Sequence, residues 1–177
     1  MSQNAQVIRL RYSWLSQGEI ETLFTLLSDP FEVVEEVSEE VDDSYPSMIN
    51  MEFPIAYDKT FFKTFGIDRW ERMKEVLKNL KWRRGKKGIK LLLRFFGPAT
   101  VTFSIKSEDD RTFGKALDMI EYFADIILFQ IDAKRLPSDV REIKYEFDRE
   151  NFRWYPDKAL GNNAEYSYVN DEWIIPQ

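Results

Sequence analysis

The sequence predicts an α+β fold: a mostly antiparallel sheet built from hairpins, with about three helices packed on one face. Three observations support this prediction. Apolar residues recur at intervals of three and four along residues 67–84, which is the period of a helix with one buried side. The period changes to two in residues 89–96 and again in residues 101–105, as is typical of strands. Gly97 and Pro98, between those two stretches, indicate a hairpin turn.

The N-terminal part is expected to form a strand followed directly by a helix. Residues 8–14 alternate between apolar and polar, which is typical of a half-buried strand. Ser16 and Glu19 have the spacing of a capping box, in which each side chain satisfies a free amide of the first helical turn. Leu15 and Ile20 have the spacing of a hydrophobic staple. We expect the helix to stop at residues 29–30, where Asp precedes Pro.

The next segments are expected to be extended. Residues 31–41 mix two- and four-residue spacings, and we interpret them as a strand that frays into an acidic loop at residues 42–44. Residues 48–55 alternate clearly, and Pro54 indicates that this strand ends there or lies at an edge of the sheet. Residues 57–65 are interpreted as a connector whose phenylalanines pack under the helix of residues 67–84.

The C-terminal half repeats the order of helix and hairpin. Residues 113–127 form a near-ideal apolar stripe, so we expect a third helix, more deeply buried than the others, with its N-cap within residues 107–110. Strands are expected around residues 143–147 and 152–155. A short final hairpin should turn at Asn170-Asp171. The whole chain then consists of one strand followed by three helix-hairpin units.

Composition narrows the functional classes. A chain of 177 residues is expected to form one globular domain over residues 1–177. It contains no cysteine and no histidine, which excludes disulfides, thiol nucleophiles and imidazole or thiolate metal ligands. It shows no signal-peptide pattern and no apolar run long enough to span a membrane, so we expect a cytoplasmic protein that does not bind membranes.

Charge is unevenly distributed along the chain. Residues 12–58 contain 12 acidic residues and no Lys or Arg. Residues 59–94 contain 13 basic residues against three acidic ones, a net charge of +10, although the whole chain carries −6. Opposed blocks of this kind can steer a protein onto a partner or onto a second copy of itself.

The basic block contains the candidate binding patch. Its members are cations and one tryptophan at the end of the second helix and in the strand after it: Lys78, Lys81, Trp82, Arg83, Arg84, Lys86, Lys87, Lys90 and Arg94. The cations could neutralise phosphates and Trp82 could stack on a base, which would make residues 81–94 a nucleic-acid-binding elbow. The alternative is a solvated helix end whose cations suit the helix dipole.

Two other patterns in the sequence resemble binding motifs, and each has a simpler interpretation. Residues 85–88 have the Gly-x-x-Gly spacing of the KH-domain loop, but the strand period that follows argues against that module. Asp118, Glu121 and Asp125 are spaced as metal-binding carboxylates on a helix can be, but no histidine accompanies them, and a solvated helix face is the simpler interpretation.

These observations predict a non-catalytic, cytoplasmic protein-interaction module. No phosphate-binding loop, dinucleotide fingerprint or nucleophile elbow is present, so we expect no enzyme activity, catalytic residue, cofactor or metal. Phe, Trp and Tyr make up 15% of the chain, more than one small core readily holds, and aromatic residues are enriched at interfaces. The expected partner is a protein or a second copy of the chain. A nucleic-acid partner bound through Lys81 to Arg94 is the alternative.

Overall fold

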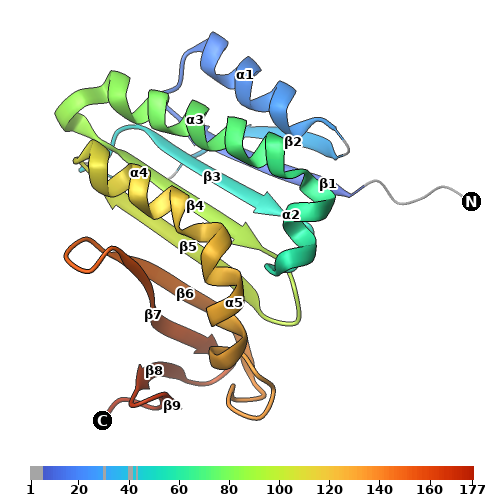
Figure 1. Cartoon of the computed structure of the whole chain (residues 1–177), viewed down its shortest axis with the longest axis vertical. Helices are drawn as coiled ribbons and strands as arrows, with labels where there is room; N and C mark the ends of the chain where they lie inside the picture. Colours follow the sequence, from blue (N-terminus) through green and yellow to red (C-terminus); the bar gives the residue numbers. More distant parts are fainter. Residues whose placement is uncertain (1–5, 30, 40–41, 43) are drawn as a thin grey trace, which may run out of the picture.

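The computed structural model describes residues 6–29, 31–39, 42 and 44–177. The strands are β1 (Val7–Ser13), β2 (Glu32–Val37), β3 (Met48–Phe53), β4 (Ile89–Phe95), β5 (Thr100–Ser107), β6 (Val140–Asp148), β7 (Arg153–Gly161), β8 (Glu165–Val169) and β9 (Glu172–Ile174). The helices are α1 (Gln17–Leu27), α2 (Lys59–Phe65), α3 (Ile67–Arg84), α4 (Asp110–Asp118) and α5 (Ile120–Gln130), and a 3-10 turn, η1 (Gly85–Lys87), follows α3. The described segments therefore form an α+β structure, shown in Figure 1.

The sheet is mixed, which corrects the mostly antiparallel arrangement that we predicted. Its strand order is β2-β1-β3-β4-β5-β6-β7-β8-β9. The pairs β1–β2, β3–β4 and β5–β6 are parallel, and the remaining neighbours are antiparallel. Parallel neighbours need a long crossover, and each of these three pairs is joined through helices. The predicted hairpins are confirmed for β4–β5, β6–β7 and β8–β9, but β2 and β3 do not form one.

β1, and not a hairpin turn, determines where β2 and β3 lie. All six residues of β3 are buried, and this strand pairs with β1 on one side and β4 on the other. β2 is exposed along most of its length and pairs only with β1. Glu32, Glu35 and Glu36 on this outer strand are typical of edges protected against pairing with another chain.

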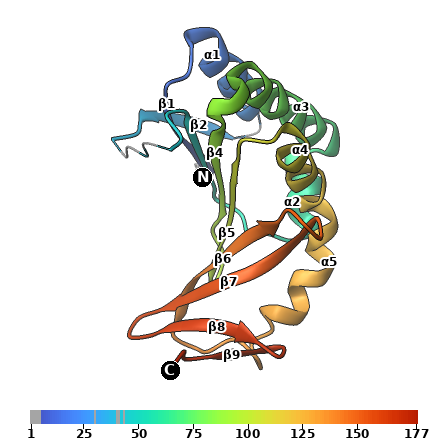
Figure 2. The ribbon, with the colours of Figure 1, turned by 90° about the vertical axis from the view of Figure 1, so that its left-hand side faces the viewer.

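The helices lie on one face of the sheet, as predicted (Figure 2). Because β1 and β3 run in opposite directions and their crossovers move towards opposite edges, these two crossovers have the same hand. β5 runs in the direction of β1, but its crossover moves towards the same edge as that of β3, so its hand is opposite. About 98% of such connections are right-handed. Crossovers of opposite hand cannot all be right-handed, so this sheet contains an exception to the rule.

Five helices in the described residues replace the three that we predicted. Residues 59–65 form α2, with the Asp58 side chain as its N-cap, so the interpretation of this segment as a connector was wrong. The predicted third helix is divided into α4 and α5 at Met119. Asp109 caps α4 as expected. No helix within the described ranges is long and apolar enough to cross a membrane.

The core lies between the helices and the sheet and is rich in aromatic rings. Phe61 and Phe65 of α2 are buried, as expected for this segment, and Phe61 packs within 5.1 Å of Phe53 and 4.9 Å of Phe95 between ring centroids. Tyr57 lies 4.8 Å from Phe103 in the same way. Many of the aromatic rings that composition suggested could be exposed are therefore buried in one continuous layer.

Candidate protein-interaction site

The predicted basic patch is divided among several surroundings. Lys78 donates to Asp118 of α4 at 2.8 Å. Lys81 is almost fully buried and donates to Asp110 at 2.6 Å. Lys90 and Arg94 lie on the opposite side of the sheet, on the face that the helices leave open. The nine residues therefore do not form one surface.

Arg84, which was assigned to the patch, serves the fold instead. Its guanidinium donates to both carboxylate oxygens of Glu19, at 3.2 and 2.8 Å, and also to Ser47 Oγ and the Trp14 carbonyl. Burial raises the pKa of Glu19, but the hydrogen bonds from Arg84 and the Ser16 amide, and the charges of Arg84 and Arg83, lower it further than burial raises it. Glu19 thus both caps α1 and ties it to the end of α3.

The exposed remainder of the patch is small. Trp82 is 70% exposed, and Lys86 and Lys87 are exposed, with no ion pair to any residue that the structure describes. Arg83 is exposed and lies 3.6 Å from Glu19. Trp14, which the sequence did not single out, is also exposed and adopts a positive φ of 54°. This end of the molecule retains two tryptophans and three cations.

The three carboxylates considered as metal ligands bind lysines instead. Glu121 accepts hydrogen bonds from Trp70 Nε1 at 2.9 Å and Lys74 Nζ at 2.7 Å. Burial lowers the pKa of Lys74, but its hydrogen bonds to Glu121 and Glu71 and their charges raise it further. Asp118 and Asp125 pair with Lys78 and Lys59 and remain 43% and 65% exposed, as expected for a solvated helix face, whereas the Glu121 side chain is largely buried. No group of three metal-ligating side chains occurs in the described part of the chain.

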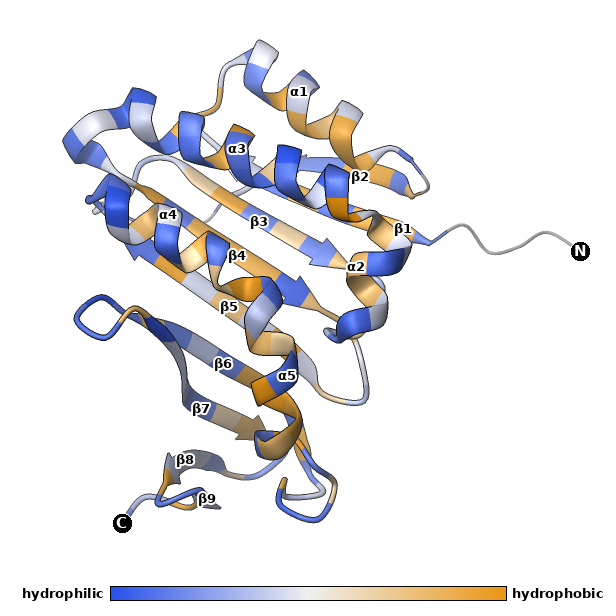
Figure 3. Ribbon diagram, in the orientation of Figure 1, coloured by the Kyte–Doolittle hydropathy of each residue, from blue (hydrophilic) through white to orange (hydrophobic). Residues whose placement is uncertain are grey.

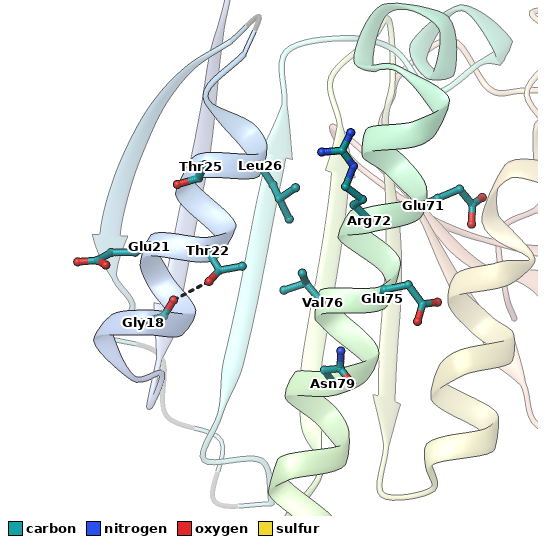
Figure 4. Close-up of a pocket in the computed structure, with 10 residues that line it drawn as sticks. All are labelled: Gly18, Glu21, Thr22, Thr25, Leu26, Glu71, Arg72, Glu75, Val76 and Asn79. Carbon is teal, nitrogen blue, oxygen red and sulfur yellow. Dashed lines mark hydrogen bonds between the residues drawn. The ribbon is translucent and has the colours of Figure 1, made fainter.

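A groove of about 700 Å³ runs between α1 and α3 (Figure 4). Leu26 and Val76 point towards each other across it, while Glu71 and Glu75 point away from α1. Lys74 and Lys78 neutralise these two glutamates. Leu26 and Val76 therefore form an apolar part of the groove lining.

The outer face of α5 is a second apolar surface. Eight of the eleven residues of α5 are apolar, and Figure 3 shows the helix coloured largely hydrophobic. Ile120, Phe123 and Ile127 are buried against the sheet. Four further apolar side chains face outward, and we call them the α5 surface: Tyr122, Ile126, Leu128 and Phe129.

The exposed fractions of this surface are high for an apolar helix face. Tyr122 is 65% exposed, Ile126 52% and Phe129 69%. These three residues follow the i, i+4, i+7 spacing with which one helix packs against another. Glu121 and Asp125 form the polar side of α5, and an exposed apolar face beside it has the composition of an interface.

Hydrogen bonds at both ends hold α5 in place. Tyr57 Oη donates to the carbonyl of Ile120 at the first residue of the helix. Trp173 Nε1 donates to the carbonyl of Gln130 at the last residue, at 2.9 Å. The exposed face is therefore presented on a fixed scaffold.

A cavity of about 370 Å³ adjoins the α5 surface. It lies between α5 and β7, and Tyr122 and Ile126 line it together with Arg153, Tyr155 and Pro156. Such a pocket can receive a side chain from a partner, as aromatic and aliphatic anchors do at the centres of interfaces.

The sequence contained a signal for this site that we did not use. The helical period predicts one buried apolar stripe, which includes Phe123 and Ile127. The segment Ile120-Glu121-Tyr122-Phe123-Ala124-Asp125-Ile126-Ile127-Leu128-Phe129 has apolar residues on its other side as well. A helix with two apolar sides requires two packing partners, and one of them is absent from the described fold.

Comparisons of the chain with models of protein families, with curated proteins and with solved structures returned no match.

Proposed function

We propose that this protein is a non-catalytic interaction module that associates with a second copy of itself through the α5 surface. The observation that carries the proposal is the apolar outer face of a helix fixed at both ends. Eight of the fifteen large apolar side chains exposed in the described residues lie at or beyond Tyr122, so exposed apolar surface is concentrated in this part of the chain. Apolar patches of this kind mark interaction sites.

The flanks of the surface fit a second copy. Two copies related by a two-fold axis use the same patch, so the patch must be complementary to itself. Asp125 lies on the α2 side of α5, where it pairs with Lys59, and Arg153 lies on the β7 side. A two-fold axis along α5 sets the Lys59–Asp125 ion pair of each copy against the Arg153 side of the other.

Charge blocks contribute less to this proposal than the sequence suggested. Members of the acidic and basic blocks already pair within the molecule, as Glu19 does with Arg84, Glu52 with Arg94 and Asp42 with Lys90. These internal pairs leave little charge for long-range steering. Apolar burial is therefore the expected driving force for association.

Nucleic-acid binding by residues 81–94 is the second candidate. The exposed Trp82, Lys86 and Lys87 favour it, since they combine a stacking ring with cations. Against it, Lys81 and Arg84 are held by Asp110 and Glu19, which leaves few cations to neutralise phosphates.

The first prediction compares two substitutions matched in residue type and exposure. Ile126 on α5 and Ile67 on α3 are both 52% exposed. We expect the unmodified protein to change from monomer to dimer between about 1 and 100 µM. Ile126→Asp should weaken the dimer at least about thirtyfold, because a charge would be buried at the centre of the interface. Ile67→Asp should dimerise as the unmodified protein does. Sedimentation equilibrium measures the masses.

Salt separates this mechanism from pairing of charge blocks. Association through the α5 surface should persist at about 1 M salt, where the screening length falls to about 3 Å. An unmodified protein that is monomeric throughout the concentration series would contradict the proposal. Dimers that dissociate with salt and tolerate Ile126→Asp would assign association to the charge blocks. Fluorescence anisotropy with labelled RNA and DNA tests the second candidate in parallel.

A further inference from the structure

The helix-free face of the sheet is concave and contains a cavity of about 500 Å³ (Figure 2). Its floor spans β1 to β7, on the opposite side of the sheet from the helices. This volume is within the range of sites that hold small ligands. The lining is mostly charged, and Leu92 is the one aliphatic side chain among the described lining residues.

Some of the charges in this cavity neutralise one another. Glu52 accepts from Arg11 at 3.2 Å and from Arg94 at 3.1 Å, and Arg94 also lies 3.5 Å from Glu142. Lys158 lies 3.6 Å from Glu165. These pairs form a neutral background and leave the two arginines committed to the sheet.

Other charged groups in the lining have no ionic partner in the described residues. Lys106 and Lys144 make no ion pair there, and neither do the carboxylates of Glu146 and Asp157. Glu146 accepts only a 3.3 Å hydrogen bond from Tyr155 Oη. Two cations and two carboxylates are thus gathered in one cavity without pairing.

The strand register brings these unpaired charges close together. Ser104 lies directly opposite Glu146 across β5 and β6. Lys106 is two residues beyond Ser104 on its strand, and Lys144 is two residues before Glu146. Positions two residues apart are about 7 Å apart along a strand, and diagonal neighbours about 7–8 Å. A small ligand can therefore reach a cation and a carboxylate at once.

We propose that this cavity binds a small zwitterion that carries an ammonium and a carboxylate group, as an amino acid does. Lys106 and Lys144 attract the carboxylate, and Glu146 and Asp157 attract the ammonium. A simple anion such as phosphate fits less well, because Glu146 and Asp157 would repel it. Leu92 offers contact to an aliphatic side chain. The site lies on the other face from the α5 surface and does not depend on dimerisation.

The test is an NMR titration of the ¹⁵N-labelled protein with leucine. We expect saturable shifts in the amides of β5 and β6 at ligand concentrations up to about 10 mM, ten times the concentration that half-fills a site with a Kd of about 1 mM. N-acetylleucine lacks the ammonium and leucinamide lacks the carboxylate, so each should bind at least about tenfold more weakly. Leucyl-leucine, in which the two groups are further apart, distinguishes a free amino acid from a peptide.

Matched variants assign the binding to the cavity. Lys106→Gln and Glu146→Gln should each weaken leucine binding about tenfold. Lys86→Gln and Glu32→Gln, which alter exposed residues outside the cavity, should leave it unchanged. Absence of saturable shifts with leucine overturns the proposal. So do shifts with N-acetylleucine, leucinamide and leucyl-leucine that equal those with leucine, or tighter binding of inorganic phosphate. Leucine binding that Lys106→Gln and Glu146→Gln both leave intact also overturns it.

Discussion

Glu19 illustrates how one residue serves two levels of the fold. Its carboxylate accepts from the Ser16 amide at 2.9 Å and completes the capping box, while Arg84 binds the same group from the end of α3. The capping box was predictable, because its two residues are three apart and satisfy each other locally. The bond to Arg84 joins residues 65 positions apart, and nothing in local spacing indicates such a pair.

The lowered pKa of Glu19 predicts a pH-dependent stability. A carboxyl whose pKa is lower in the folded state stabilises the fold above its unfolded pKa, and this contribution is lost as pH falls through the folded pKa. We expect Glu19→Gln to reduce the unfolding free energy at about pH 7, and the deficit relative to the unmodified protein to shrink below about pH 4.5. Urea denaturation at several pH values measures both.

Glu21→Gln provides the control on the same helix. Glu21 is exposed and accepts a hydrogen bond from Gln17 on the same helix, so its substitution should change stability little at any pH. If the difference between the unmodified protein and Glu19→Gln were independent of pH, the charge of Glu19 would not be the stabilising feature.

Elements were predictable where their pattern was strong, and pairings were not. The strands of residues 89–95 and 140–148 and the helix of residues 67–84 follow their periods, so their positions were predicted well. α2 was missed because Phe61, Phe62 and Phe65 occupy a seven-residue helix, too short to show a period. β2 was placed correctly as a strand, but its parallel partner β1 is separated from it by a helix, and a local pattern cannot show such a partner.

Residues 85–88 form the turn between α3 and β4, and this turn predicts different costs for substituting its two glycines. Gly85 and Gly88 both have positive φ, at 54° and 68°. A Cβ on Gly88 would lie 2.9 Å from the Ser107 carbonyl oxygen and 3.1 Å from the Tyr45 ring, whereas a Cβ on Gly85 would meet nothing within 4 Å.

Alanine at either glycine should therefore destabilise the fold, but by unequal amounts. Gly85→Ala should cost about 1–2 kcal/mol for the left-handed backbone alone. Gly88→Ala should cost that and about 1–3 kcal/mol more, because its methyl group is forced against backbone. Chemical denaturation compares the two variants. Equal losses would show that the close approach of Ser107 and Tyr45 does not constrain this turn.

At the scale of the whole molecule, the fold pairs acidic residues with basic residues that are distant in sequence. The acidic and basic blocks are consecutive in sequence, and the sheet order makes β3 and β4 neighbours, so Glu52 and Arg94 meet. The same topology moves Lys90 and Arg94 to the open face and Lys81 into the helix layer. The predicted basic patch, which was defined by proximity in sequence, is therefore dispersed over the molecule. The α5 surface, by contrast, depends on which face of that helix the sheet leaves uncovered.

The most direct test of the central claim is disulfide cross-linking at the α5 surface. The chain contains no cysteine, so a single introduced thiol reports only on its own position. A disulfide requires Cα atoms within about 4.4–6.8 Å, which the two copies of residue 126 reach if they face each other near the two-fold axis. Under mild oxidation we expect Ile126→Cys to form covalent dimers rapidly and Ile67→Cys, equally exposed on α3, to form none. Equal cross-linking of the two variants, or none at residue 126, would contradict the proposed dimer.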